Sequence, residues 1–463
     1  MTMRLAEPNA TRDKSRCATT HTRNAHDADA GREATGLDSS RNLQPPQVRA
    51  RKLRAKRWER RRKSGEFLAP LAVESINSDQ PRHVRPARCS WTLGQGVGIM
   101  HDGTRPAGYT GVERCGSIWT CPHCASVLRT GRAAEVEKAV STHQDNGGQL
   151  LFFTGTVRHH KGDDLATTLG AIKTAWRKMT GNRPWKTRKQ KHQITGHITA
   201  TEITYGDHGW HPHSHFLFFL DAPISDEELD EFRQWLFTAW ADGVEKAGAK
   251  RPTDSGLDLQ RVDEKGRVLS RYLSKIQDEK NSWSAGAELA RADVKHGRAG
   301  SLTPFELLDE DNHAGLDEKT RGRLWREFYQ VTKGKSALYW SPGLKARFEI
   351  GQIEDEEILD EAESTELVWR TSASSYRAAR RRQSGDGLLV RALECAEDEN
   401  WTELAMILPP MELPDDDDDE CADLPSRTDG TGDGVPPDRL TDALTREEKP
   451  RRKKRGWSAR YRS

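Results

Sequence analysis

The chain has 463 residues, of which 34% are hydrophobic and 31% are charged, with a formal net charge of +2. This length allows two or three domains, but so polar a composition indicates that a good part of the chain does not pack into a core. No apolar run approaches the ~20 residues of a membrane span, and residues 1–14 lack the apolar region of a secretory signal. We therefore expect a cytoplasmic protein without a membrane partner, whose seven cysteines stay reduced and serve metal binding or chemistry before disulfides.

Charge is concentrated in blocks near both ends of the chain. Residues 51–63 include nine basic residues in thirteen, residues 415–420 are all acidic, and residues 449–455 are basic again. Such blocks are typical of disordered arms, and basic ones often contact nucleic acid, although solvated tails that only aid solubility are the alternative. We expect a basic, mostly disordered arm over residues 1–87, and charged helices followed by a low-complexity tail over residues 350–463.

A cysteine-rich segment follows the basic arm and spans residues 88–145. It supplies four cysteines that could share one metal ion: Cys89, Cys115, Cys121 and Cys124. The last two form the C-x2-C knuckle "CPHC", and four thiolates in a tetrahedral array are typical of a closed, structural zinc site. His123 could take the place of Cys89, and reduced cysteines without metal are the alternative. The other three cysteines lie in polar flanks and form no cluster.

The next part of the chain alternates between strand and helix patterns. In chain order, strands are expected at 149–159, 195–206, 211–221 and 256–263, and helices at 163–181, 225–248 and 266–280. Ser225 and Glu228 form a capping box at the start of the second helix. The order β-α-β-β-α-β-α predicts an α+β fold, an antiparallel sheet covered by helices and close to the ferredoxin-like plan.

Three histidines alternate in the strand "GWHPHSHFLFFLD", at residues 209–221. His211, His213 and His215 should point to the same face, because successive side chains of a strand alternate between faces. If "GDHG" is a four-residue hairpin loop, Glu202 lies directly opposite His213, and its carboxylate joins the imidazoles. This set suits a divalent metal with open positions. A slip of one residue would turn Glu202 away, and a hairpin with solvated histidines is the alternative.

The helix at 266–280 carries a tyrosine and a lysine on one surface. Tyr272 and Lys275 are three residues apart and therefore neighbours on the helix. Tyr272 also belongs to an apolar stripe, so an ordinary core tyrosine is the alternative reading. A tyrosine oxygen can act as a nucleophile when a metal polarises the attacked centre, and a nearby ammonium can lower the phenol pKa or stabilise developing charge.

Taken together, the motifs "LFFTGTVRHH", "RCGSIWTCPHC", "WHPHSHFLFF" and "RYLSKIQD" resemble those of the replication initiators of rolling-circle plasmids. These proteins are HUH endonucleases, and the likeness is to initiators of actinobacterial plasmids. It extends over residues of roughly 88–345. The resemblance implies an HUH endonuclease core over residues 146–285, with a C-terminal extension of this core over 286–349.

The resemblance also implies roles for individual residues. His213 and His215 would be the metal-binding pair, His211 a flanking histidine, Tyr272 the nucleophile and Lys275 its accompanying lysine. Glu202 as the third ligand rests on the hairpin register. The metal would be Mg²⁺ or Mn²⁺. The protein would nick a plasmid origin that is single-stranded at the nick site, leaving a 5′-phosphotyrosine and a 3′-OH, with a host helicase and DNA polymerase as partners.

Some positions depart from the family pattern. Ser214 stands where the histidine motif prefers a bulky apolar residue, and Val268 stands where some relatives carry a glutamate that helps to terminate replication. The "GKS" at 334–336 is no ATP-binding loop, because Tyr329 replaces the earlier glycine. The basic stretches 159–162 and 185–192 could contact phosphates, or be solvated loops.

Two other functions remain open at this point. An HUH transposase or a conjugative relaxase would use the same nick-and-join chemistry, although there is no second tyrosine near Tyr272 and no ATPase domain follows. A non-catalytic, zinc-containing DNA-binding regulator would use the cysteines and the basic arms, but would need neither the alternating histidines nor Tyr272.

Overall fold

The structure is a computed structural model that describes residues 46–73, 82–262, 301–311, 314–362, 365–382 and 385–411. All of them belong to one compact unit that ends at Met411. Tyr272, Lys275 and the helix expected at 266–280 lie outside the described residues. Among the described residues, no helix is long and apolar enough to cross a membrane.

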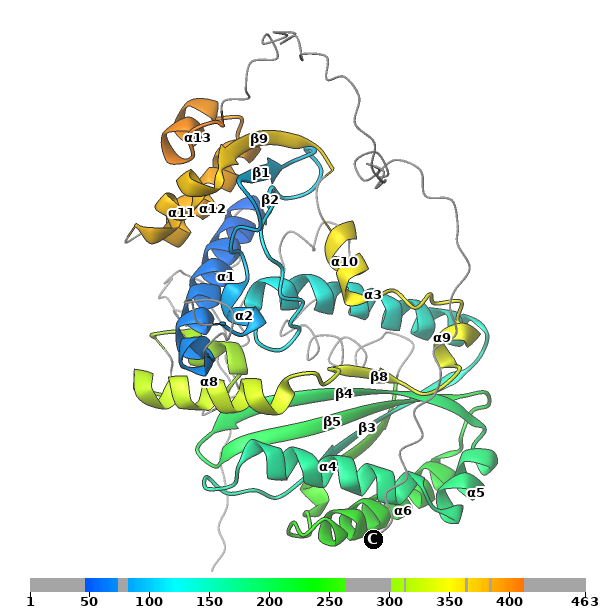
Figure 1. Cartoon of the computed structure of the whole chain (residues 1–463). Coiled ribbons are helices and arrows are strands. Elements are labelled where there is room, and N and C mark those ends of the chain that lie inside the picture. The colour runs from blue at the N-terminus through cyan, green and yellow to red at the C-terminus, as the bar shows by residue number, and fades with distance from the viewer. Residues whose placement is uncertain are drawn as a thin grey trace, which may run out of the picture. The chain divides into compact units, whose positions relative to one another are not determined.

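An antiparallel sheet forms the centre of this unit (Figure 1). Its strands are β3 (Gln149–Thr156), β4 (Ile194–Gly206), β5 (Gly209–Leu220), β6 (Leu257–Arg261), β7 (Ser301–Leu302) and β8 (Leu338–Trp340). The strand order is β6-β3-β5-β4-β7, and β8 also pairs with β4. The long hairpin of β4 and β5 thus lies in the middle of the sheet, with β3 beside β5.

Three helices cover one face of the sheet, namely α4 (Leu165–Thr180), α5 (Arg183–Lys191) and α6 (Asp226–Lys246). The alternate β5 residues Phe216, Phe218 and Leu220 pack against them in one apolar core. The predicted capping box of α6 is present, because the Ser225 and Glu228 side chains each accept from the other's backbone N–H. These caps satisfy N–H groups that have no partner within the helix.

The opposite face of the sheet is covered by α3 (Pro122–Asp145) and the short α9 (Leu344–Arg347). Here the odd-numbered side chains of β5, such as Leu217 and Phe219, form a second core. The alternation of the strand therefore places the histidines on the α3 side of the sheet. The predicted α+β class is confirmed, and so is the order β-α-β-β-α-β along the chain, with one extra short helix, α5.

A smaller sheet lies apart from the first and joins distant parts of the sequence. It has the order β2-β1-β9 and consists of β1 (Gly96–Met100), β2 (Gly108–Thr110) and β9 (Leu367–Ser372). The helices around it are α11 (Ala373–Arg381), α12 (Gly385–Glu397) and α13 (Trp401–Ile407), while α10 (Asp355–Glu361) packs on α3. Helices were expected beyond residue 350; the strand β9 was not. Cys395 is buried in α12, not in a polar flank as expected.

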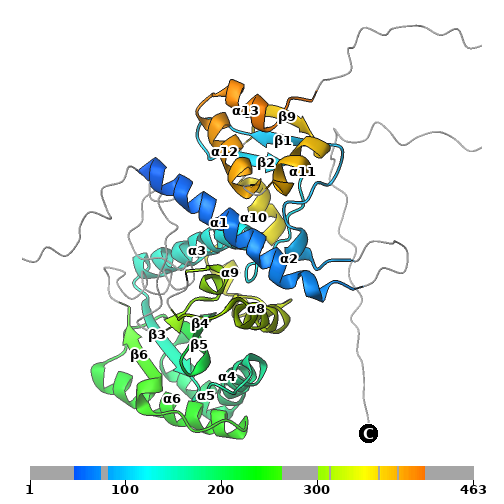
Figure 2. The same ribbon diagram turned by 90° about the vertical axis from the view of Figure 1, so that its left-hand side faces the viewer.

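The expectation of a mostly disordered arm over residues 1–87 is wrong for part of this range. Residues Pro46–Leu68 form α1, a helix of 23 residues, followed by the 3-10 helix η2 (Ala69–Leu71) and by α2 (Arg85–Arg88). Trp58 is only 2% exposed and packs against Tyr109, with ring centroids 5.8 Å apart. Figure 2 shows α1 crossing between the small sheet and the larger one. The helix is thus a central packing element.

Carboxylates from distant segments neutralise the basic side chains of α1. Bidentate pairs join Arg51 to Asp398 at 2.6 and 2.9 Å and Arg60 to Asp309 at 2.6 and 2.7 Å. The buried Arg61 donates to Asp386 at 2.8 Å. Bidentate, partly desolvated arginine pairs are the stronger class of ion pair. The basic block 51–63 therefore serves tertiary structure instead of forming a solvated arm.

The remaining elements complete the unit. They are the 3-10 helices η3 (Asp254–Gly256) and η5 (Pro304–Leu308), and α8 (Glu318–Thr332). The helix α8 contacts α1 and α4 and carries Trp325 and Phe328 into an apolar cluster that also includes Trp119 and Trp210. This cluster supports the hairpin at the end where its loop lies.

Candidate active site and metal centre

The register of the β4–β5 hairpin places the histidines as the sequence predicted. Glu202 pairs with His213, Ala200 with His215, and Tyr205 with Trp210. Trp210 points away from the histidine face, where its ring stacks on Phe328 with centroids 5.9 Å apart. A slip of one residue would turn Trp210 to the other face of the sheet, out of this aromatic cluster. The packing of Trp210 therefore fixes the register.

His215 has a partner for each ring nitrogen. Its Nε2 lies 3.0 Å from Glu202 Oε2, and its Nδ1 lies 3.0 Å from the Thr154 hydroxyl oxygen. The side chain is 1% exposed, so both contacts orient a buried ring. An ionised carboxylate accepts only, and therefore the neutral imidazole donates from Nε2 while the Thr154 hydroxyl donates to Nδ1. The hydroxyl can reverse its role, which would free a lone pair on Nε2.

The Glu202–His215 contact fits a shared divalent cation. Two ligand atoms bound at about 2.1 Å and at a right angle lie roughly 3.0 Å apart. His213 is next to this pair: its ring stacks on that of His215, with centroids 6.0 Å apart. The His213 nitrogens are too far away to form a three-ligand set with Glu202 and His215. Among the described residues, only the four cysteines bring three or more ligand atoms within 4.8 Å of one another. The ring of His213 would have to turn to become the third ligand.

His159, at the end of the motif "TGTVRHH", comes close to the histidine hairpin. Its Nδ1 lies 2.9 Å from the carbonyl oxygen of His208, and its Nε2 contacts Nδ1 of His211. The carbonyl only accepts, so neutral His159 carries its proton on Nδ1 and accepts at Nε2. His211 must then donate from Nδ1, which leaves the lone pair on its Nε2. The contact thus selects one tautomer of His211, and the sequence gave no indication of this pairing.

Burial keeps His211 neutral. Loss of hydration lowers the pKa of His211 to about 4, helped by the neighbouring His159, while the Glu202 carboxylate acts in the opposite direction. A neutral imidazole is the form that binds metal. His211, whose ring meets His213 edge-on with centroids 4.0 Å apart, is therefore in a ligand-competent state at neutral pH.

The four predicted cysteines come together in a buried cluster. Sulfur–sulfur distances are 3.5 Å for Cys89–Cys121 and 3.8 Å for both Cys89–Cys124 and Cys115–Cys124. All four thiols are free and buried, and their sulfurs lie within 4.8 Å of one another. The cluster could hold a metal ion. Its fourth member is Cys89 and not the alternative His123, whose ring lies against Trp58.

Local structure explains how these cysteines meet. Cys121 is the N-cap of α3, and its sulfur accepts from the backbone N–H of Cys124 in the first turn. Cys89 is the C-cap of α2, and its carbonyl accepts from the buried Arg61 at 2.9 Å. Hydrogen bonds from the neighbouring sulfurs, of which that from Cys115 contributes most, lower the pKa of the Cys89 thiol well below its usual range. Cys89 is thus the thiolate of the cluster, the form that binds metal, whereas hydrogen bonds with the neighbouring sulfurs raise the pKa of the Cys121 thiol.

Comparison with known proteins finds one matching family model and two curated relatives. Residues 112–229 match the family model described as Replication protein. A curated relative named Protein rep, from Streptomyces lividans, is 31% identical over 292 residues, covering 51% of this chain and 63% of the relative. The Neomycin resistance protein of Streptomyces cyanogenus is 26% identical over 159 residues, covering 29% and 36%. No solved structure matches the chain.

The matched residues 112–229 include Cys115, Cys121, Cys124 and the whole β4–β5 hairpin. The chain covers less than two thirds of the length of either relative. The comparisons confirm the resemblance inferred from the motifs: the chain is similar to a replication-protein family and to Protein rep of Streptomyces lividans.

Proposed function

We propose that this protein initiates rolling-circle replication of a plasmid by nicking origin DNA through metal-dependent tyrosine transesterification. The observation that carries the proposal is the Glu202–His215 pair, 3.0 Å apart on a hairpin within residues that match a replication-protein family. A central β-α-β-β-α-β sheet with this hairpin in its middle agrees with an HUH palm.

The proposed metal site consists of His213, His215 and Glu202, with His211 beside them. A bound Mg²⁺ or Mn²⁺ would neutralise charge on the scissile phosphate. In the metal-bound state the Thr154 hydroxyl would reverse its role and accept from Nδ1 of His215, while His159 accepts from Nδ1 of His211. Each imidazole would then present the lone pair of its Nε2 to the cation.

Tyr272 is the proposed nucleophile. Its phenolic oxygen would attack the phosphorus, form the P–O bond of a 5′-phosphotyrosine and displace the 3′ oxygen of the preceding nucleotide as a free 3′-OH. Lys275 would stabilise the negative charge that the phenol acquires as it loses its proton. One phosphoester replaces another, so resealing needs no ATP. A host polymerase would extend the 3′-OH and a host helicase would unwind the duplex.

The cysteine cluster is the proposed site of a structural zinc ion. Cys89, Cys115, Cys121 and Cys124 leave no open position for a substrate, which is typical of structural zinc sites. The site would join the end of α2 and the start of α3, both far from the hairpin in sequence.

A nicking assay tests the proposed function. Labelled single-stranded origin DNA is incubated with the full chain and Mg²⁺ or Mn²⁺, and the products are resolved on denaturing gels. We expect cleavage and a covalent protein–DNA adduct, both lost on chelation and in a His213→Ala, His215→Ala variant. Binding without cleavage would instead indicate a non-catalytic DNA-binding regulator.

A further inference from the structure

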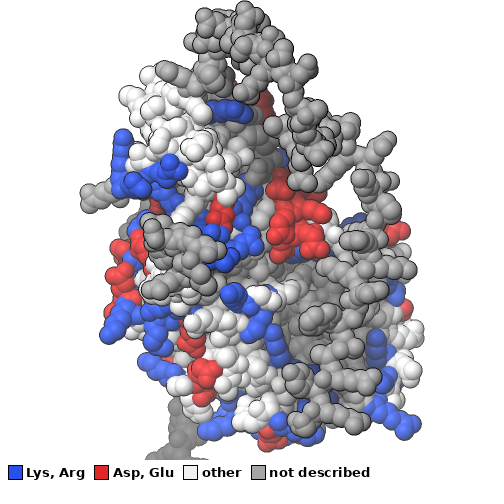
Figure 3. All heavy atoms as spheres, in the orientation of Figure 1, with Lys and Arg blue, Asp and Glu red and all other residues white. Residues whose placement is uncertain are grey.

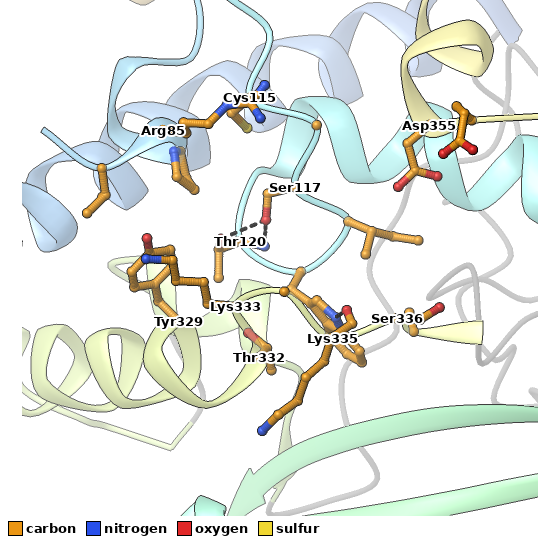
Figure 4. Close-up of a pocket in the computed structure, with 18 of the residues that line it drawn as sticks. Arg85, Cys115, Ser117, Thr120, Tyr329, Thr332, Lys333, Lys335, Ser336 and Asp355 are labelled. Carbon is orange, nitrogen blue, oxygen red and sulfur yellow. Dashed lines mark hydrogen bonds between the residues drawn. The ribbon is translucent and has the colours of Figure 1, made fainter. Parts of the chain in front are cut away.

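A deep groove lies between α2 and the end of α8, next to the cysteine cluster (Figure 4). It has a volume of about 1060 Å³. Its walls are the segment 82–88, the loop 115–120 that leads into α3, and the loop 333–338 between α8 and β8. We call it the α2–α8 groove. Cys115 of the cysteine cluster contributes to its wall, whereas His211, His213, His215 and Glu202 do not.

One end of the groove is electrically neutralised. Arg132 is paired with Glu135 at 2.7 Å and with Asp355 at 2.6 Å, and Lys345 is paired with Glu135 at 2.9 Å. The acidic side chains of α10 form one patch next to this end, with basic side chains gathered to its left in Figure 3. An anion would gain little here, because every cation already has a carboxylate partner.

The other end carries cations that have no such partner. Arg82, Arg85 and Lys333 line it, all three are exposed, and none has a carboxylate within ion-pair distance among the described residues. Arg85 makes one hydrogen bond, to the carbonyl oxygen of Arg114 at 3.3 Å, and Lys333 lies against the Tyr329 ring, 5.9 Å from its centroid. In Figure 4, Arg85 faces Tyr329 and Lys333 across the groove.

The rest of this end is polar at the surface and aromatic beneath. The Ser117 and Thr120 side chains line the wall and hydrogen-bond to each other at 2.9 Å. Trp119 packs on Phe328 with centroids 6.0 Å apart, and Phe328 in turn stacks on Trp210, the residue before His211. Packed rings therefore connect the groove directly to the histidine hairpin, so a ligand in the groove is held at a fixed position relative to the hairpin.

We propose that the α2–α8 groove binds the phosphate backbone of the origin DNA beside the nick site. This inference rests on the proposed function, which supplies a DNA substrate. Uncompensated cations with hydroxyl groups between them suit phosphate oxygens, whereas the buried Trp119 and Tyr329 rings offer no open face for base stacking. The groove therefore positions DNA for the hairpin and does not read its sequence.

The salt dependence of DNA binding tests this assignment. A variant with Arg82→Gln, Arg85→Gln and Lys333→Gln is compared with a charge-matched control, Arg177→Gln, Arg183→Gln and Lys246→Gln, on α4, α5 and α6. Binding of a fluorescent origin duplex is measured by anisotropy between 50 and 200 mM salt. All six side chains are exposed, and thermal melting checks that both variants fold.

Each lost phosphate contact lowers the slope of log affinity against log salt by about 0.9. The slope of the groove variant should therefore be smaller by about 2 to 3. Between 50 and 200 mM salt, the wild type should lose about 40 times more affinity than the variant does. The loss should be equal for origin and unrelated duplexes. A slope equal to that of the control would overturn the assignment. The assay measures binding without cleavage, so its result tests the groove independently of the nicking proposal.

Discussion

Replacing Cys124 by serine should abolish the proposed zinc site while leaving the rest of the unit folded. Three of the six sulfur–sulfur distances are 3.5 to 3.8 Å, and all six are within 4.8 Å. A regular tetrahedron with edges of 3.5 to 3.8 Å has its centre about 2.1 to 2.3 Å from each corner, close to the zinc–thiolate bond length of about 2.3 Å. We expect one zinc per chain in the wild type and much less in Cys124→Ser.

Zinc K-edge X-ray absorption on the full chain provides the assay, because it reports the ligand type and distance. The wild type should show four sulfur neighbours near 2.3 Å and no nitrogen. Cys395→Ser is the matched control, since Cys395 is a buried free thiol in α12 outside the cluster. It should retain a full equivalent of zinc, whatever its effect on stability.

Two results would refute this reasoning. A nitrogen neighbour would make His123 a ligand and remove one cysteine from the site. A wild-type chain purified without zinc, and as stable after chelation as before, would show that the cysteines pack as ordinary reduced thiols.

Three further perturbations follow from the structure. His215→Gln should weaken Mn²⁺ binding, measured by paramagnetic resonance, by about tenfold or more, whereas the exposed His160→Gln should not. Burial, helped by the charge of Lys189, lowers the pKa of His197 to about 4, so the unfolded chain binds a proton there that the folded one does not. The unfolding free energy should fall by up to about 3 kcal/mol between pH 6.5 and pH 4, as followed by thermal melting. The His197→Phe variant should lose correspondingly less, and an equal loss in the variant and the wild type would contradict this prediction. Trp58→Ala should cost about 3–5 kcal/mol of unfolding free energy and lower Tm, whereas Val48→Ala, on the exposed side of the same helix, should change Tm little. Equal melting temperatures for the two variants would mean that residues 46–68 do not pack as a structural helix.

The central hairpin was predictable because its information is local. Gly206 pairs with Gly209, so the turn has two residues, Asp207 and His208, instead of the four assumed from the sequence; both turns pair Tyr205 with Trp210. Strict alternation then places Glu202 opposite His213. Capping residues such as Ser225 likewise act on their immediate neighbours. The cysteine cluster was predictable for a different reason, since metal chemistry restricts which residue types can meet.

Tertiary partners far away in sequence explain what local patterns missed. The basic block 51–63 is polar enough to suggest an arm, and it forms a packed helix only because carboxylates such as Asp309, Asp386 and Asp398 neutralise it. The strand β9 pairs with β1, more than 260 residues earlier, and has no hairpin signal. His159, just beyond the end of β3, meets His211 on the neighbouring strand β5, 52 residues later in the sequence, so neither spacing nor periodicity indicated the contact.

The most direct test of the nicking proposal is the covalent adduct on Tyr272. Wild type, Tyr272→Phe and the control Tyr339→Phe, at an exposed tyrosine of β8, are incubated with labelled single-stranded origin DNA and Mg²⁺ and then denatured. Wild type and control should yield a labelled protein band and a cut strand whose 3′-OH a polymerase extends, and Tyr272→Phe should yield neither. An adduct formed by Tyr272→Phe, or a wild type that binds the DNA and leaves it intact, would contradict the account.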